Sequence, residues 1–390
     1  MVGRKFAAAL VALAAIAACS GGGSTATPRP PAAYPLDDTL RLNDLQALGT
    51  HNSYHVQAEQ KLFDTLKSFD ATLATSIEYS HPPLSEQFDN EGIRQIELDV
   101  FADPAGGLYA KRGGPPIVGL PGDTDAAALS QPGFKVMHVQ DVDFRSTCLT
   151  FVACLTTVRD WSRAHPGHAP IMIEVEAKQD TIPDPLNVGF AIPHSIGGPE
   201  LDALDAEIRS VFNADELITP DTVRGTHATL EEAIHADGWP TLGNSRGKVL
   251  FTLDNEDAIR DAYVAGHPAL KGRILFTSSP RGAPEAAFMK LNDPVADEAK
   301  IRQAVLDGYV VRTRADADTV QARSGDTTMR DAAIRSGAQW VSTDYPVADT
   351  RFTTYSVTIP GGTPARCNPV LAPRDCTPAG IESPAHLTAR

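Results

Sequence analysis

Several features that would point to familiar protein classes are missing from this 390-residue chain. Lys and Arg form no cluster and the formal net charge is −15, which argues against a nucleic-acid partner because phosphate binding needs grouped cations. Long apolar runs are also missing, and the run at residues 6–18 is too short to span a bilayer as a stable helix. Neither an internal repeat nor a coiled-coil heptad is present. With 42% hydrophobic and 21% charged residues, the composition is that of a globular protein of one large domain or two modest ones.

The amino-terminal segment has the pattern of an export signal. Arg4 and Lys5 precede the apolar run, as in a secretory signal peptide. The run ends in Ile-Ala-Ala-Cys, which resembles the bacterial lipobox, in which the cysteine is diacylated and becomes the first mature residue. An ordinary signal peptide that contains a cysteine is the alternative. Residues 21–35 are rich in Gly, Ser, Thr and Pro and have nothing to bury. We therefore expect a signal peptide at 1–18, a tether at 19–38, and an exported protein that is anchored to the cell envelope through lipidated Cys19 or released.

Cysteine is scarce, and its spacing is informative. Besides Cys19, the chain has Cys148 with Cys154 and Cys367 with Cys376, two close pairs. In an exported protein, two local disulfides are the simplest interpretation. A zinc site is the rival, but neither pair has CxxC spacing or a nearby histidine.

Short apolar runs that end in polar residues recur along the chain. They lie at residues 45–52, 93–100, 135–141, 171–178, 249–254, 273–278, 309–316 and 339–346. Several are rich in Val and Ile, which is typical of buried parallel strands, and helical patterns such as 201–212 and 299–308 lie between them. Eight strands with intervening helices predict an α/β fold, a (β/α)₈ TIM barrel over residues 39–350, with an open doubly wound sheet as the competitor. Residues 351–390 carry no functional signal and are expected to be a strapped-down extension.

The ends of these runs carry the chemistry. In (β/α)₈ barrels the active site gathers at the carboxyl ends of the strands. The polar residues found there are His51, Asn52, Glu97, Asp99, His138, Glu174, Glu176, Lys178, Asp254, Arg314 and Asp344. Residues two apart on a strand point to the same side, so Glu97 and Asp99 share a face. Carboxylates grouped in a barrel mouth are costly unless a cation lies between them. Oxygen ligands such as Asn52, Glu97, Asp99 and Glu176 suit Ca²⁺ or Mg²⁺ rather than zinc.

Four of these blocks resemble a known family. GTHNSYH (49–55), GIRQIELDVF (92–101), KVMHVQD (135–141) and PIMIEVEAK (170–178) occur in the order of the X-box of phosphatidylinositol-specific phospholipases C. The resemblance is strongest to the calcium-dependent bacterial and fungal group, and segments 79–110 and 238–255 are similar to that group too. It runs from about residue 42 to about residue 350, so it covers the whole predicted barrel.

The resemblance implies roles for individual residues. His51 matches the histidine that donates to the phosphate in the transition state, and His138 matches the general acid toward the leaving group. The calcium ligands would be Asn52, Glu97, Asp99 and Glu176, with Glu97 also a candidate base. Lys178 falls where a contact to the substrate phosphate is expected, and Arg314 and Asp344 at later strand ends are further candidates for substrate contact. Ca²⁺ is favoured over Mg²⁺ by the resemblance, although the ligand types permit either.

The implied reaction is attack of the inositol 2-hydroxyl on its neighbouring phosphodiester, which releases diacylglycerol and a cyclic inositol phosphate. The expected partners are a phosphoinositide lipid and a membrane surface reached through Cys19, and nothing suggests an obligate protein partner, so we expect a monomer. Two alternatives stay open. Glycerophosphodiester phosphodiesterases share the barrel, the acidic pair and paired histidines, but use an HRG-type start where this chain has His51-Asn52-Ser53. A surface lipoprotein that binds its ligand without turnover is the other.

Overall fold

The structure is a computed structural model in which residues 34–384 are described. The predicted signal peptide, Cys19 and all but the last five residues of the predicted tether lie outside the described residues. Residues 34–38 differ from the expectation of a tether, because Tyr34 is buried and the Arg246 guanidinium stacks over its ring at 3.5 Å from the centroid. The folded domain therefore begins earlier than its composition suggested.

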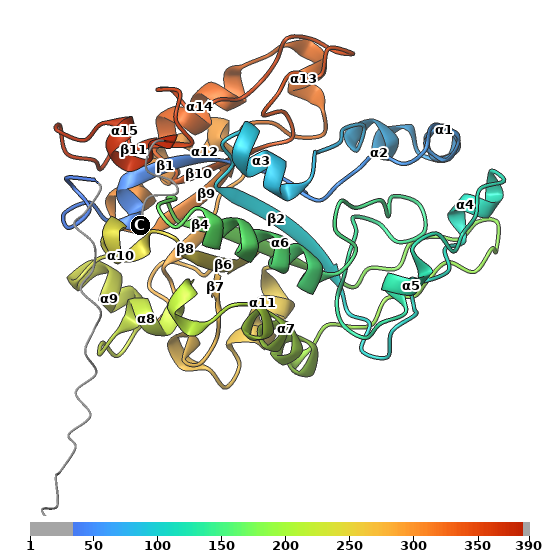
Figure 1. The fold of residues 1–390 in the computed structure, drawn as a ribbon, viewed down its shortest axis with the longest axis horizontal. Helices are drawn as coiled ribbons and strands as arrows, with labels where there is room; N and C mark the ends of the chain where they lie inside the picture. The colour runs from blue at the N-terminus through green and yellow to red at the C-terminus, as the bar shows by residue number, and fades with distance from the viewer. Residues whose placement is uncertain (1–33, 385–390) are drawn as a thin grey trace, which may run out of the picture. The chain divides into compact units, whose positions relative to one another are not determined.

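Parallel strands, which Figure 1 labels at the centre of the fold, are paired into a closed ring. In order around it they are β1 (Leu45–Thr50), β2 (Gln95–Phe101), β4 (Ile171–Lys178), β6 (Val249–Leu253), β7 (Leu275–Thr277), β8 (Phe288–Lys290), β9 (Val310–Arg314) and β10 (Trp340–Thr343). Parallel ladders join most neighbours, β10 returns to β1, and a single parallel bridge from Ser278 to Phe288 joins β7 to β8. The predicted TIM barrel is confirmed. Apolar strand residues are buried because both faces of such a sheet are covered.

The remaining elements surround this ring. The longer helices are α1 (Gln60–Phe69), α6 (Phe151–Ala164), α7 (Gly198–Val211), α11 (Asp257–Val264), α12 (Pro294–Leu306) and α14 (Thr328–Ser336). The shorter ones are α2 (Ala71–Ser76), α3 (Leu84–Asn90), α4 (Gly114–Ile117), α5 (Ala126–Leu129), α8 (Pro220–Arg224), α9 (Leu230–Ala236), α10 (Leu242–Ser245), α13 (Val320–Ser324) and α15 (Pro378–Ile381), with 3₁₀ turns at Leu42–Asp44, Ala214–Glu216 and Pro268–Leu270. The short strands are β3 (Lys135–Val136), β5 (Leu217–Ile218) and β11 (Ala365–Cys367). Within residues 34–384, no helix is both long enough and apolar enough to cross a bilayer.

The prediction of one barrel strand was wrong. Residues 135–141 were expected to form the third barrel strand, but only β3 is extended there, and it pairs antiparallel with the end of β2. The barrel strand that the sequence analysis missed is β8, which has three residues and follows a segment of Pro, Gly and Ala. A run this short gives too few positions for a period of two to stand out. His138 therefore lies in a loop rather than at a barrel strand end.

The long loops beyond the carboxyl ends of β1, β2 and β4 have a small core of their own. Figure 1 shows α1, α2, α4 and α5 extending to one side of the barrel. Beneath them is a cluster separate from the barrel core, formed by Ala58, Leu62, Phe63, Ala74, Phe101, Tyr109, Met137 and Phe144. The loops after β1 and β2 contribute the buried members, and partly buried Ala191 of the loop after β4 packs against them, so this second core holds the loops in one arrangement.

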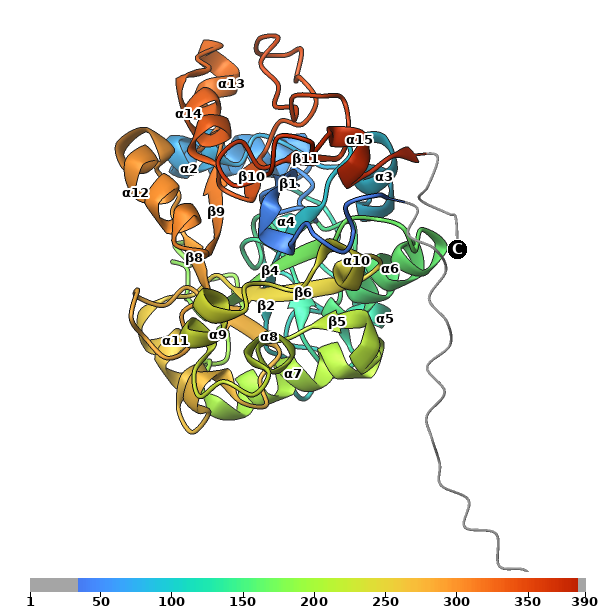
Figure 2. The same cartoon turned by 90° about the vertical axis from the view of Figure 1, so that its left-hand side faces the viewer.

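The later part of the carboxy-terminal extension, from β11 onward, is strapped to the opposite end of the barrel. β11 pairs antiparallel with β1 (Figure 2). In this register Cys367 faces Leu45. Glu382 is buried, forms an ion pair with Arg94, and accepts a hydrogen bond from the backbone N–H of Ala169 at 2.9 Å. Arg94 directly precedes β2, and Ala169 lies just before β4. The contact with Glu382 therefore holds the amino-terminal ends of these two barrel strands together.

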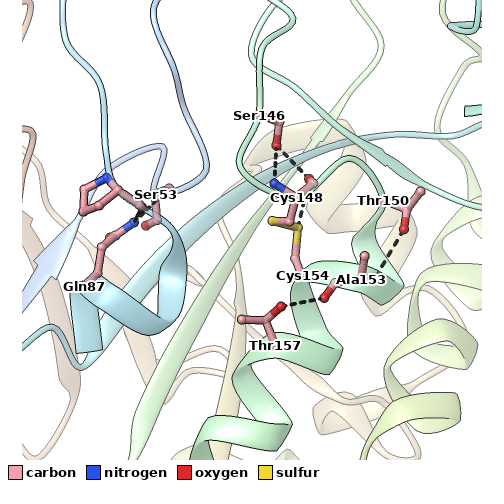
Figure 3. Close-up of a disulfide and its surroundings, with 9 residues drawn as sticks. Ser53, Gln87, Ser146, Cys148, Thr150, Ala153, Cys154 and Thr157 are labelled. Atoms are coloured by element: carbon pink, nitrogen blue, oxygen red, sulfur yellow. Dashed lines mark hydrogen bonds between the residues drawn. A yellow bond between two sulfur atoms is a disulfide. The ribbon is translucent and has the colours of Figure 1, made fainter. Parts of the chain in front are cut away.

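Both close cysteine pairs form disulfides, Cys148 with Cys154 and Cys367 with Cys376. The first joins the loop that carries His138 to the first turn of α6. Figure 3 shows Ser146 beside it, where the hydroxyl donates to the carbonyl of Cys148 at 2.7 Å. In the adjacent segment of the same view, the Gln87 amide donates to the carbonyl of Ser53 at 2.6 Å. The loop of His138 and the segment after β1 are thus each fixed by covalent or hydrogen bonds to a helix.

A buried histidine at the base of the barrel makes stability depend on pH. His168 is fully buried, and burial, together with the Arg94 charge, lowers its pKa from 6.5 to about 4. The folded pKa lies below the unfolded value, so its contribution to stability is present above pH 6.5 and is lost as the pH falls toward 4. That loss corresponds to about 3 kcal/mol of unfolding free energy. We expect His168→Gln to reduce the fall in denaturant-measured stability between pH 7 and 4.5, and exposed His235→Gln to leave it as in the parent. An equal fall in His168→Gln and the parent would contradict this prediction.

Candidate functional site

Most of the predicted site residues gather at the carboxyl ends of the barrel strands. β1 leads into a tight turn in which Asn52 has a positive φ of 44°, a conformation that Asn tolerates better than most residues. The His55 N–H donates to the Asn52 carbonyl at 2.8 Å and closes this turn. The turn therefore presents His51 and Asn52 at the mouth of the barrel.

His51 is paired with Asp344 from the end of β10. The distance from His51 Nδ1 to Asp344 Oδ1 is 2.8 Å, and an Arg314 guanidinium nitrogen lies 3.3 Å from the same ring nitrogen. Burial alone would raise the pKa of Asp344, but the His51 hydrogen bond and charge and the Arg314 charge hold it at about 2. Asp344 is therefore a carboxylate at neutral pH. It pairs with the His51 imidazole, and its expected contact with substrate stays a prediction.

The environment of His51 favours its neutral form. Burial, and then the Arg314 charge, lower the pKa of His51 to about 3, even though Asp344 acts in the opposite direction. The expected charged donor is thus neutral in the free protein. With Nδ1 directed at a carboxylate, Nδ1 carries the proton, so Nε2 is the unprotonated nitrogen. Nε2 lies 3.7 Å from Glu97 Oε1.

A second histidine and aspartate pair lies in the loop after β3. His138 Nδ1 is 2.8 Å from Asp143 Oδ2, and the other side of this carboxylate meets His55 Nε2 at 2.9 Å. Burial would raise the pKa of Asp143, but the His55 charge and the hydrogen bonds from both histidines hold it well below its usual range. The sequence analysis missed Asp143 and His55. Asp143 follows His138 by five residues, but no strand pattern marked it.

Aromatic rings connect the two histidine pairs. The Tyr79 ring centroid lies 6.4 Å from that of His51 and 4.6 Å from that of His55, and the His55 ring lies 5.9 Å from the His138 ring. The Asn52 amide donates to the Tyr79 hydroxyl at 3.2 Å. His51 and His138 are therefore brought to one site from separate segments.

Between these pairs, strand register places acidic residues opposite each other. In the β2–β4 ladder, Glu97 faces Glu174 and Asp99 faces Glu176. Oxygens of Glu97, Asp99 and Glu176 all lie within 4.8 Å of one another. Burial, and then the charge of Glu176, raise the pKa of Asp99 well above its usual range. Like charges at neighbouring strand positions are destabilising, so this arrangement needs positive charge from elsewhere.

Two cations of the chain supply part of that charge. Arg312, buried on β9, forms an ion pair with Glu97, and its Nε lies 3.0 Å from Glu174 Oε2. Lys178 Nζ lies 3.2 Å from Glu176 Oε1 and 3.4 Å from Asp99 Oδ2. The sequence analysis missed Arg312, which lies inside the barrel two residues before the end of its strand. Glu174, which the resemblance had left without a role, is its second carboxylate.

The charge balance leaves Asp99 incompletely compensated. Among the described residues, both Asp99 oxygens are buried without a hydrogen-bond partner. Tyr54 lies nearby, since its hydroxyl is 3.5 Å from Asn52 Oδ1 and the charge of Asp99 contributes, after burial, to raising its pKa. A buried carboxylate without a hydrogen-bond partner, set among other carboxylate oxygens, is the environment that a hard divalent cation fits, whereas zinc favours imidazole or thiolate donors. Glu97, Asp99 and Glu176 thus fit the metal that the sequence predicted, and Asn52 as its fourth ligand stays a prediction.

The contact between His138 and Asp143 can be tested in the free protein. Because Asp143 is a carboxylate, it keeps the proton of neutral His138 on Nδ1, and Asp143→Asn is expected to shift the tautomer toward protonated Nε2. Long-range ¹H–¹⁵N NMR reports the tautomer directly. Asp344→Asn serves as the matched control and should change the tautomer of His51 alone. An unchanged His138 spectrum in Asp143→Asn would show that this contact does not orient the ring.

Comparisons with known proteins give a matching family model and solved structures of similar fold. The family model described as phosphoinositide phospholipase C, Ca²⁺-dependent, matches residues 40–369. Two solved structures of a calcium-dependent phosphoinositol-specific phospholipase C from a Gram-negative bacterium, Pseudomonas sp., have a similar fold, one an apo form and one a myoinositol complex. Each is 19% identical with a TM-score of 0.51, over 85% of this chain and 97% of the other. No curated protein matches the chain.

Proposed function

We propose that this chain, which belongs to the family of Ca²⁺-dependent phosphoinositide phospholipases C, cleaves phosphatidylinositol to diacylglycerol and a cyclic inositol phosphate. The members of this family are phosphoric diester hydrolases. The observation that carries the proposal is the cluster of Glu97, Asp99 and Glu176, in which the buried Asp99 oxygens have no hydrogen-bond partner among the described residues and Lys178 Nζ lies 3.4 Å away. A histidine and aspartate pair lies next to it. Asn52, Glu97, Asp99 and Glu176 would hold the metal. Ca²⁺ bound there would lower the pKa of the attacking hydroxyl and stabilise the negative charge that develops on the phosphate.

His51 is the base in this proposal. A base must be unprotonated and free to receive a proton, and His51 Nε2 meets both conditions while Asp344 fixes Nδ1. Burial raises the pKa of Glu97, the other candidate base, well above its usual range, but its carboxylate is already engaged in the ion pair with Arg312. The inositol 2-hydroxyl loses its proton to His51 as its oxygen bonds to phosphorus. Glu97 keeps the role of a metal ligand.

His138 is the acid. As the bond from phosphorus to the glycerol oxygen breaks, that oxygen takes a proton from His138, so diacylglycerol leaves as a neutral alcohol. The negatively charged Asp143 stabilises the protonated imidazole before transfer and holds its orientation. His55, on the other side of Asp143, is a positioning residue because it acts only through that carboxylate.

Arg314 and Lys178, the two cations expected to contact the substrate phosphate, have different positions. Arg314 donates to the carbonyl of Asp316 at 3.0 Å and lies beside the His51 pair, where it can contact the substrate phosphate. Lys178 lies between Asp99 and Glu176, so in the free protein it neutralises acidic ligands. A contact between Lys178 and the phosphate requires the side chain to leave these carboxylates.

The place of action is a further part of the proposal. The pattern at residues 1–19 supports export and lipidation at Cys19, and the two disulfides support an oxidising compartment. An enzyme held at the envelope, and acting as a monomer, would meet its lipid substrate at a membrane surface.

The first test of the reaction is product identity. Mature protein should release a cyclic inositol phosphate from phosphatidylinositol micelles with Ca²⁺, and much less with Mg²⁺ or EGTA, as followed by phosphorus NMR. His51→Ala should lower kcat by a factor of about 10² to 10⁴, as expected for loss of a general base. Exposed His235→Ala is the matched control and should keep full activity. Cleavage of glycerophosphocholine in place of phosphatidylinositol would assign the chain to the glycerophosphodiesterase reaction.

The metal site can be tested without turnover. Thermal unfolding of the parent should shift upward with Ca²⁺, because a ligand that binds only the folded state stabilises it. In Asp99→Asn we expect this shift to be lost, while stability in EGTA rises by about 1 kcal/mol because one of several repelling buried charges is removed.

Asp205→Asn is the matched control for this prediction. Asp205 is also buried, but it accepts a hydrogen bond from Tyr263 at 2.6 Å and has Arg273 within 3.5 Å. Its substitution should therefore lower stability in EGTA and keep the Ca²⁺-dependent shift. A full Ca²⁺ response in Asp99→Asn would exclude the proposed ligand set.

A further inference from the structure

An apolar groove lies beside the candidate site, and neither histidine pair uses it. Its volume is about 320 Å³, at the lower end of the range for small-ligand pockets. One wall is formed by Leu62, Leu66 and Phe69 of α1, and the facing wall by Ile182, Leu186 and Phe190 of the loop after β4. Among its lining residues the polar ones are Thr65 and Asp70.

Both polar groups of the lining are already engaged. The Thr65 hydroxyl donates to the carbonyl of Lys61 at 2.9 Å. Asp70 accepts hydrogen bonds from the N–H groups of Thr72 and Leu73, at 3.1 and 2.9 Å, as the N-cap of α2. The groove thus offers an apolar surface with no polar group directed at an occupant, which fits a hydrocarbon and no headgroup.

The groove is continuous with the loop that carries the proposed acid. Val139 and Val142 form part of its lining, and they lie directly after His138 and directly before Asp143. The acid must stand on the side of the leaving group, which is the glycerol oxygen of the lipid. The acyl chains attached to that glycerol are therefore delivered next to Val139 and Val142.

The walls are held in place without an occupant. Asp141, from the same loop, accepts hydrogen bonds from the N–H of Gly113 at 2.6 Å and of Ala191 at 2.7 Å. Asp184 accepts from the N–H groups of Val188 and Gly189 and so fixes the turn that presents Leu186. A preformed apolar groove binds more tightly because little ordering is needed when the ligand enters.

We propose that this groove binds one acyl chain of the lipid substrate while the headgroup occupies the metal site. The proposal rests on the proposed function.

The competing occupant is a membrane surface into which exposed apolar side chains insert. Phe69 and Leu186, 60% and 48% exposed, line the groove, whereas Val188 and Ile192, 40% and 72% exposed, lie on the same loop as Leu186 and outside the lining. This difference separates the two occupants experimentally.

The test uses substrates that do not form a membrane. Monoacyl glycerophosphoinositols with chains of four to ten carbons, kept monomeric, are compared by kcat/KM in the parent enzyme with Ca²⁺. A methyl ester of inositol 1-phosphate, which has no acyl chain, reports the chemistry of the headgroup site alone. We expect kcat/KM to rise by up to about fourfold per added methylene, which is about 0.8 kcal/mol, until the chain fills the groove. The methyl ester is expected to be a slow substrate.

Two double variants assign the effect. Phe69→Ser with Leu186→Ser should flatten the dependence on chain length and leave the methyl ester rate unchanged. Val188→Ser with Ile192→Ser is the matched control and should keep the dependence of the parent. A flat profile in the parent would overturn the proposal. An equal loss in both double variants would overturn it too and would assign these side chains to membrane contact.

A binding measurement keeps the groove separate from the reaction. Monodecanoylglycerol should bind the parent and the control variant, and more weakly the Phe69→Ser, Leu186→Ser variant, by calorimetry. If the methyl ester and all lipids resist cleavage, the proposed function fails. The same binding result would then still support a hydrocarbon groove, and equal or absent binding in the three proteins would exclude it.

Discussion

The alignment of β2 with β4 is the constraint on which the site depends. Their parallel register places Glu97 opposite Glu174 and Asp99 opposite Glu176, so acidic side chains project together into the barrel. Such a cluster would destabilise the fold if it were left alone. The chain answers it with Arg312 between Glu97 and Glu174 and with Lys178 between Asp99 and Glu176. Negative charge that these two cations do not compensate remains at Asp99, and a divalent cation can neutralise it.

The two histidine rings are also oriented by buried charged groups. Each ring has one nitrogen directed at a buried carboxylate, Asp344 for His51 and Asp143 for His138, and both carboxylates have lowered pKa values. A buried ionised aspartate next to an imidazole fixes the tautomer and favours the protonated ring. Arg314 opposes that effect at His51, where burial and then the Arg314 charge lower the pKa of the imidazole. The His51 ring is therefore neutral in the free protein, and Asp344 fixes its tautomer.

Sequence patterns located the part of the site that regular strands carry. Glu97, Asp99 and Glu176 could be placed together because a period of two and a common barrel end fix their direction. Asp143, His55 and Arg312 could not be placed in this way. Asp143 lies in a loop whose path is set by the antiparallel β3 pairing and the Cys148–Cys154 disulfide. His55 lies in the turn after β1 and is bridged to Ser146, and Arg312 lies deeper in its strand than the residues at strand ends. His138 was placed on a strand that does not form, although the loop brings it to the site.

The loop at residues 138–143 contributes to both the candidate site and the apolar groove. Its polar members, His138 and Asp143, form one of the two histidine and aspartate pairs, and Val139 and Val142 line the apolar groove. Asp141 of the same loop bonds to two further loops, and Met137 belongs to the second core. A shift of this loop would move the proposed acid and a groove wall together. The second core beneath it therefore does more than support surface loops, because it fixes the position of the proposed acid relative to the apolar groove.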